Sequence, residues 1–121
     1  MMKRALVAAM AIAAFAITSS GQQAARNLYV VAHVDVPPNF MQETAVLLHQ
    51  FAAESRKDAG AVRVEVLQET VRPNHFTLLE VWRTRPAFEA HVAATHTKSF
   101  REKLHAMLGS PFDERLNVFL K

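Results

Sequence analysis

Hydrophobic and polar residues alternate along three stretches of the chain, with the period of two that is typical of β-strands. These stretches are residues 27–36, 61–69 and 75–84. In the first, every second residue from Leu28 to Val36 is apolar, so that these side chains share one face. Pro37 and Pro38 end it, because neither can donate a hydrogen bond to a neighbouring strand. We interpret residues 114–121 as a final strand that is apolar on both faces.

Between the strands, apolar residues recur at intervals of three and four, which predicts helices with one face toward a core. We expect Asn39 to cap the first helix and Pro86 to open the second helical region. The inward faces, one for each helical piece, are Phe40, Thr44, Leu47, Leu48 and Phe51; then Phe88, His91, Val92 and Thr95; then His96, Phe100, Leu104, Met107 and Leu108.

The resulting order, β-α-β-β-α-β, predicts an α+β protein with the ferredoxin-like split β-α-β fold, in which helices cover one face of an antiparallel sheet. The other face carries Leu67, Leu79 and Val81 among polar residues. A second copy stacked on this face would hide them from water, so we expect a homodimer.

The first 21 residues have the features of a secretory signal peptide. Two basic residues precede a run of thirteen apolar ones, Ala5 to Ile17, and a small polar segment follows. This run is shorter than the roughly 20 residues that span a bilayer, so no integral membrane span is expected after cleavage. We therefore expect an exported protein, periplasmic or secreted, with residues 22–121 as its single domain.

The charge balance argues against nucleic acid as a partner. The formal net charge is +3, but Lys3 and Arg4 belong to the predicted signal peptide. The remaining chain keeps 12 of the 14 basic residues and all 11 acidic ones, with no basic run to bind a phosphate backbone. The chain has no cysteine, so hydrophobic burial rather than disulfides must stabilise it.

Glu80 is the acidic residue that the pattern places among hydrophobic ones. It shares a strand face with Phe76, Leu78 and Trp82 by the period of two. Burial disfavours a carboxylate and raises its pKa unless a cationic partner restores the charge. A structural ion pair with Arg56 or Arg85 is the alternative to a role in chemistry.

His91 and His96 face inward near the end of the same strand and are candidates for a general base, since histidine titrates near neutral pH. The alternative is a pair of core histidines. Their spacing of five residues does not suit metal binding on a continuous helix, although a break between the helical pieces could still allow it. No third ligand has motif spacing, so no metal is expected. Flavin, nicotinamide and phosphate-loop motifs are absent from the sequence.

Two segments carry a resemblance to a known family. EVWRTRPAFEAHVAATHTKSF resembles the Glu-x-Trp, eight residues, His, four residues, His pattern of the antibiotic biosynthesis monooxygenase (ABM) domain. ESRKDAGAVRVEVLQE is similar to that family's passage of Arg, an acidic residue, Gly and a strand. With YVVAHVDV, the resemblance covers about residues 28–120. The sequence departs from the pattern at Thr95, where the family has Pro, and at Ala59-Gly60-Ala61, where it has Pro-Gly-Cys.

The resemblance implies a dimeric α/β barrel and a cofactor-independent monooxygenase acting with O₂ on a small aromatic substrate, a quinol or a polycyclic phenol. It implies a pocket between sheet and helices. The family pattern falls on Glu80, Trp82, His91 and His96. His91 or His96 would be the base, Glu80 would hold the imidazole, and Trp82 would stack on the substrate. The further candidates for substrate binding are Phe51, Phe88 and Phe100.

Two alternatives belong to other functional classes. The first is a dimer that binds a small hydrophobic ligand without turnover. The second is a haem-degrading relative of the same superfamily, which would need an axial histidine and a larger cavity. Oxygen consumption separates the first alternative from the monooxygenase, and a Soret shift on addition of haem would identify the second.

Overall fold

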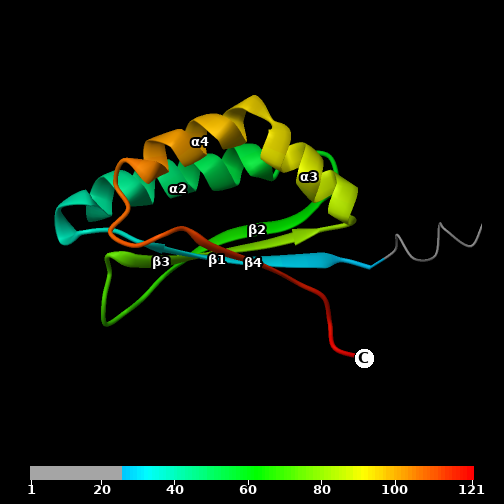
Figure 1. The fold of residues 1–121 in the computed structure, drawn as a ribbon, viewed down its shortest axis with the longest axis horizontal. Coiled ribbons are helices and arrows are strands. Elements are labelled where there is room, and N and C mark those ends of the chain that lie inside the picture. Colours follow the sequence, from blue (N-terminus) through cyan, green and yellow to red (C-terminus); the bar gives the residue numbers. More distant parts are fainter. Residues whose placement is uncertain (1–25) are drawn as a thin grey trace, which may run out of the picture.

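The computed structural model describes residues 26–121, and the predicted signal peptide lies outside them. Three α-helices pack on one face of a four-stranded sheet (Figure 1). The strands are β1 (Leu28–Asp35), β2 (Ala61–Gln68), β3 (His75–Trp82) and β4 (Asp113–Asn117). The helices are the 3₁₀ helix η1 (Pro38–Phe40) and the α-helices α2 (Met41–Ser55), α3 (Arg85–Ala93) and α4 (Thr95–His105).

The sheet has the strand order β2-β3-β1-β4, and each neighbouring pair is antiparallel. β1 and β3 pair along their whole length, from Leu28 opposite Trp82 to Asp35 opposite His75. The prediction of a ferredoxin-like α+β fold is confirmed. This register places Glu80 on a central strand, opposite Val30 on β1 and Val64 on β2.

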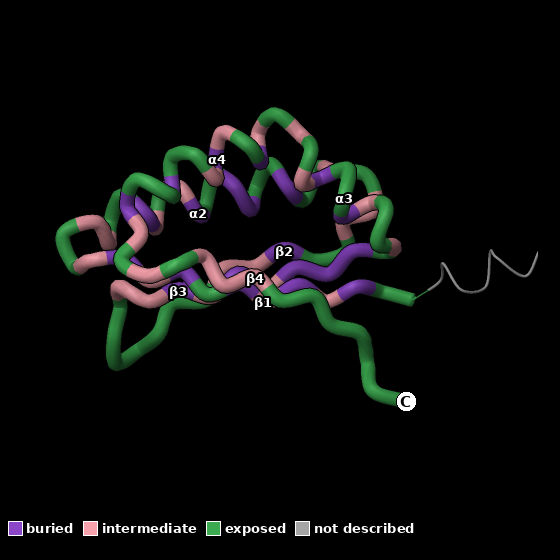
Figure 2. The backbone as a smooth tube through the Cα atoms, in the orientation of Figure 1, coloured by how far each residue is buried: buried purple, intermediate pink, exposed green. Residues whose placement is uncertain are grey.

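The predicted alternation matches the burial of β1 and of most of β3 (Figure 2). It is wrong for β2, where the pairing with β3 shifts register between Ala61 and Arg63 and Val62 is 49% exposed. On β3, the face beneath the helices consists of Phe76, Leu78, Glu80 and Trp82, all of them buried. On β1 the same face consists of Leu28, Val30, Ala32 and Val34, also buried. Each large apolar side chain that leaves water in this way contributes about 1.5–3 kcal/mol, which is the main stabilisation available to a domain without disulfides.

The beginning of the first helical region differs from the expectation. Asn39 does not cap it; it lies exposed inside η1, and neither η1 nor α2 has a side-chain cap. Pro37 and Pro38 explain the difference, because the fixed φ of proline favours the first turn of a helix and so starts the 3₁₀ turn before Asn39. The buried face of α2 is close to the predicted one and consists of Thr44, Leu48, Phe51, Ala52 and Ser55.

α3 and α4 are separated by a single non-helical residue. Thr84 caps α3 by accepting a hydrogen bond from the amide of Ala87 at 3.1 Å. Ala94 has extended backbone angles, with φ −66° and ψ 145°, so that α4 starts in a new direction. Within residues 26–121, none of the helices is both long and apolar enough to cross a bilayer.

The last strand is shorter than predicted. β4 ends at Asn117, which pairs with Tyr29, and residues 118–121 leave the sheet. β1 begins only one residue before Tyr29, so a longer β4 would have no partner strand. Val118, Phe119 and Leu120 are consequently exposed, and Leu120 is 99% exposed. The expectation of a strand over residues 114–121 was therefore wrong for residues 118–121.

Candidate active site

Glu80 lies at the centre of the site, on β3 beneath the helices, and is 2% exposed. The indole Nε1 of Trp82 donates a hydrogen bond to Oε1 of Glu80 at 3.0 Å. Nε2 of His91 lies 3.4 Å from the same oxygen. A carboxylate on the core face of a strand is therefore held between an indole and an imidazole.

The structural ion pairs that the sequence offered for Glu80 do not form. Arg56 donates instead to the backbone carbonyl of Val64 at 2.9 Å. Arg85 pairs with Glu89 on the exposed side of α3. The partner of Glu80 comes from α3 through His91, which makes the carboxylate part of the candidate site.

Burial favours the uncharged forms of both members of this pair. It raises the pKa of Glu80 to about 7, although the hydrogen bond from Trp82 acts in the opposite direction. Burial also lowers the pKa of His91, against the effect of the neighbouring Asp58 carboxylate. Near neutral pH, Glu80 is poised to exchange a proton, which is a property that catalytic carboxylates share.

Asp58 joins the two histidines and is the site residue that our sequence interpretation missed. Its Oδ2 lies 2.7 Å from Nδ1 of His91 and 3.0 Å from Nε2 of His96. The only signal for it in the sequence is its place as the acidic residue in the second segment of the family resemblance. Nothing in the local pattern of the α2–β2 connection shows that its side chain meets α3 and α4.

The turn after α2 holds Asp58 in place. Its amide donates to the carbonyl of Ser55 and its own carbonyl accepts from Ala61, each at 3.1 Å. Gly60 completes the turn with φ +82°, a conformation that residues with a Cβ rarely adopt. Its missing side chain also matters, because a Cβ at this position would lie 2.5 Å from that of Ala87 on α3. The turn and α3 can therefore approach closely.

The two histidines differ in their access to solvent. The side chain of His91 is 1% exposed, whereas those of His96 and Asp58 are 23% and 24% exposed. The rings of His91 and His96 are 5.6 Å apart. Although Nε2 of His96 lies 3.0 Å from Asp58, the two groups are not aligned as a hydrogen bond, and this nitrogen makes none within residues 26–121. His96 and Asp58 are therefore close neighbours without a hydrogen bond between them.

The predicted aromatic residues surround His91, but they are packed against one another. The ring of Trp82 lies 4.4 Å from that of His91, and Phe88 lies next to both. Phe51 stacks on Phe100 at 3.9 Å. All four side chains are buried, so in this structure they occupy the space between sheet and helices where the sequence predicts a pocket.

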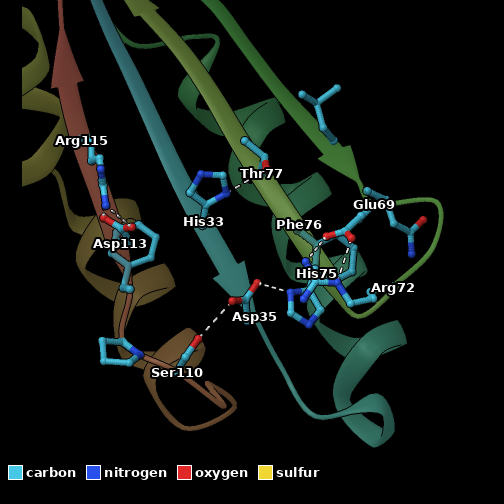
Figure 3. A pocket seen from close by; sticks show the side chains of 14 residues that line it. His33, Asp35, Glu69, Arg72, His75, Phe76, Thr77, Ser110, Asp113 and Arg115 are labelled. Atoms are coloured by element: carbon cyan, nitrogen blue, oxygen red, sulfur yellow. Dashed lines mark hydrogen bonds and ion pairs between the residues drawn. The ribbon is translucent and has the colours of Figure 1, made fainter.

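A large hollow lies elsewhere, on the sheet face that the helices leave open (Figure 3). It has a volume of about 910 Å³, and its charged groups pair among themselves. These pairs are Asp35 with His75, Glu69 with Arg72, and Asp113 with Arg115. Glu80, Trp82, His91 and His96 line neither this hollow nor two smaller ones, one between α2 and α4 and one beside residues 118–121.

The sequence model of the antibiotic biosynthesis monooxygenase family matches residues 27–103. The chain belongs to this family. The matched range contains all of the candidate site residues described above, Asp58 included. The fold is thus that of an ABM domain.

Known proteins resemble the chain along most of this ABM domain. A Bacillus subtilis protein named "Putative monooxygenase YcnE" is 24% identical over 82 residues, which are 68% of this chain and 86% of that protein. A conserved protein from Methanosarcina mazei has a crystal structure with TM-score 0.73 and 26% identity, covering 80% of this chain and 96% of the other. The structure of Rv0793 from Mycobacterium tuberculosis has TM-score 0.74, 19% identity and coverages of 78% and 96%, which shows the shared fold.

Proposed function

We propose that this chain is a cofactor-independent monooxygenase that oxidises a quinol or a polycyclic phenol with O₂. The observation that carries the proposal is the position of Asp58 between His91 and His96, within 3.0 Å of a nitrogen of each ring. A carboxylate beside an imidazole orients it and stabilises its protonated form, which is how enzymes make histidine an effective base.

His96 is the base that this geometry favours. Its side chain is partly exposed, but Nε2 has almost no accessible surface and lies beside Asp58. In our proposal Nδ1 takes the proton of the substrate hydroxyl, and the Asp58 carboxylate stabilises the resulting imidazolium. His91, enclosed between Glu80 and Asp58, is a positioning residue that keeps Asp58 in place.

The chemistry needs no external reductant, because the substrate supplies the electrons. Removal of the hydroxyl proton gives an electron-rich anion, which transfers one electron to O₂. The two radicals combine to form a carbon–oxygen bond, and the resulting peroxide loses water as its O–O bond breaks. One oxygen atom enters the product as a carbonyl and the other leaves as water. The substrate loses two hydrogen atoms overall.

Entry of a substrate requires movement of α3. This helix has nine residues and only Phe88 and His91 of them are buried. Thr84 caps its beginning, and in our proposal the extended backbone of Ala94 at its end serves as the pivot. In our proposal α3 swings outward, so that an aromatic ring can enter beside Phe51 and Trp82 and reach His96. The closed helix then excludes water from the anion.

The test is oxygen consumption by the purified protein with a panel of reduced quinols and anthrone-like phenols. We expect uptake above the rate of autoxidation, not lowered by a chelator, with one atom of ¹⁸O₂ in the product. His96→Ala should lower the rate by about 10²–10⁴-fold. The matched control is His105→Ala, since His105 is exposed at the end of the same helix, α4.

Other outcomes would replace the proposal. If no compound gives uptake but several quench the fluorescence of Trp82, the protein is a hydrophobic ligand-binding module. A Soret shift on addition of haem, lost in His96→Ala, would favour the haem-degrading alternative. Uptake that is equal in His96→Ala and in His105→Ala would contradict His96 as the base.

We also infer that two copies associate through the open sheet face into a dimeric α/β barrel. Large apolar side chains at the margins of this sheet, Leu67 and Phe119 among them, are exposed, which is typical of an interaction surface. Light scattering after size exclusion should give the mass of a dimer. Leu79→Asp should give a monomer, while Val46→Asp, at an exposed apolar position on α2, should not. A monomeric wild type would refute the association.

Export is a further part of the proposal. It rests on residues 1–21, whose sequence is that of a signal peptide and which lie outside the described residues. Intact mass spectrometry of the protein from fractionated cells should find a chain shortened by about this segment in the periplasm or medium. A full-length chain confined to the cytoplasm would refute export.

A further inference from the structure

Three potential metal ligands converge at the edge of the candidate site. Oδ2 of Asp58, Nδ1 of His91 and Nε2 of His96 all lie within 4.8 Å of one another. They come from the α2–β2 connection, from α3 and from the first turn of α4. Two imidazoles and one carboxylate form a donor set that first-row transition ions such as Zn²⁺ and Fe²⁺ bind readily.

Of these three atoms, Nε2 of His96 gives the strongest indication of a metal ligand. It has almost no accessible surface and makes no hydrogen bond in the described part of the chain, although Oδ2 of Asp58 is 3.0 Å away. A buried polar atom without a partner is uncommon in proteins, because it has lost its contact with water. Its position beside the Asp58 oxygen, out of line for a hydrogen bond, is compatible with two ligands directed at a common ion.

The break between α3 and α4 makes the convergence possible. On a continuous helix, residues five apart differ by about 140° around the axis, so His91 and His96 would face different directions. The extended backbone at Ala94 turns α4 and brings the two rings to 5.6 Å. The spacing that argued against a metal in the sequence is therefore no obstacle in the fold.

Glu80 provides the outer support that metal-binding histidines usually have. A histidine that binds a metal through one nitrogen typically donates the other N–H to a carboxylate. Nε2 of His91 lies 3.4 Å from Oε1 of Glu80, and the indole of Trp82 holds that oxygen at 3.0 Å. His91 is thus oriented to present Nδ1 toward Asp58 and His96.

We propose that Asp58, His91 and His96 form a binding site for a divalent first-row transition ion, best represented by Zn²⁺. Ligand atoms at about 2.0–2.2 Å from a tetrahedral Zn²⁺ lie about 3.4 Å from one another. The oxygen of Asp58 is now 2.7 and 3.0 Å from the two nitrogens, so small rotations of the side chains suffice. With three protein ligands, the fourth position of a tetrahedral ion is left for water.

Binding of the ion would switch off the proposed base. An imidazole that binds a metal through Nε2 carries its proton on Nδ1, so His96 can no longer accept a proton there. Zn²⁺ is then a reversible inhibitor of oxygen uptake. The inhibition rests on the proposed function, whereas the binding of the ion does not, so the two are measured separately.

The binding test is a titration of the tag-free, full-length protein with Co²⁺, followed by its visible absorption, and with Zn²⁺ by calorimetry. We expect one ion per chain, Co²⁺ bands that Zn²⁺ displaces, and a loss of affinity of at least about 100-fold in Asp58→Ala and His96→Ala. Glu80→Gln should weaken binding by about 10- to 100-fold, as loss of outer support does in other metal sites. The control variants are His49→Ala and His105→Ala, whose side chains are exposed on α2 and α4.

Circular dichroism checks that each variant is folded; His91→Ala is omitted, because removal of this enclosed side chain is expected to destabilise the protein. Absence of Co²⁺ bands in the wild type, or affinity retained in both Asp58→Ala and His96→Ala, would overturn the site. If Zn²⁺ binds as expected and no substrate gives oxygen uptake, the site stands and the monooxygenase proposal falls. If oxygen uptake occurs and saturating Zn²⁺ leaves it unchanged, the proposal that Zn²⁺ inhibits the enzyme is refuted.

Discussion

Oδ2 of Asp58 lies 2.7 Å from Nδ1 of His91, although the two residues are 33 positions apart in the sequence. The bond ties the turn after α2 to the buried face of α3. It also satisfies a polar nitrogen of a side chain that is almost wholly enclosed, and an unsatisfied nitrogen there would cost about 1–3 kcal/mol. Asp58 thus links the stability of the site to its chemistry.

Replacement of Asp58 by Asn should separate these two roles. Asn keeps the size of the side chain and can still accept a hydrogen bond from His91, so we expect the fold to survive. The negative charge beside His96 is lost, and the imidazolium formed during proton transfer is no longer stabilised. We expect kcat for oxygen uptake to fall by at least about 10²-fold.

The control for Asp58→Asn is Glu102→Gln, an equivalent loss of charge at an exposed position on α4. It should retain the rate of the wild type. Equal rates in Asp58→Asn and in the wild type would show that the carboxylate has no part in the reaction.

His91→Ala and His96→Ala should affect stability to different extents. Removal of the enclosed His91 leaves a cavity and deprives both Asp58 and Glu80 of a partner, so the free energy of unfolding should fall by about 2–4 kcal/mol. His96 is partly exposed, and its loss should cost about 1 kcal/mol or less. Urea denaturation of both variants measures the difference. Similar losses of stability would mean that His91 is not the residue that holds the site together.

Glu80 should make stability depend on pH. Its pKa is about 7 in the folded protein against an ordinary value of 4.5, so between these values the folded state binds more protons than the unfolded state. The free energy of unfolding should therefore fall as pH rises from about 4.5 to 7, by an amount on the order of 3 kcal/mol. The stabilisation linked to protonation of Glu80 is complete below pH 4.5 and absent above pH 7.

The lowered pKa of His91 acts in the opposite direction, because below its ordinary value the unfolded state takes up the proton more readily. Glu80→Gln isolates the effect of the carboxyl group, since Gln is neutral and can still accept from Trp82. We would compare urea denaturation of the two proteins across this range with a chelator present. A stability difference between them that stays constant with pH would mean that Glu80 titrates normally.

Gly60→Ala should destabilise the protein by at least about 2 kcal/mol. A residue with a Cβ at φ +82° costs about 1–2 kcal/mol, and the added methyl group would also collide with Ala87. Gly109→Ala is the matched comparison, because its nearest neighbour, Pro37 Cδ, would be 3.3 Å away and Gly109 does not have a positive φ. If Gly109→Ala lowered the free energy of unfolding more than Gly60→Ala, the close packing of the Asp58 turn against α3 would be contradicted.

β1, β3, most of the inward helix positions and the position of Glu80 could be predicted from the sequence, whereas Thr95, expected to face inward, is exposed. Their common reason is that periodicity is local: a residue on a strand or helix points to the side that its neighbours in sequence define. Glu80 and Trp82 were expected on one buried face, and the structure places them there with a hydrogen bond between them. The same local reasoning failed at Asn39 and beyond Asn117, where a proline pair and the end of the partner strand decide the outcome.

By itself, the sequence determined the fold class, the face on which the site is built and the inward direction of His91. Only the tertiary structure decided that Asp58 reaches both histidines and that the aromatic rings close over them. The break at Ala94 turns His96 toward His91, and no proline or glycine in the sequence beside it predicts this break. The physical reason is that these contacts depend on how the α2–β2 turn, α3 and α4 pack together, and no local pattern records that packing.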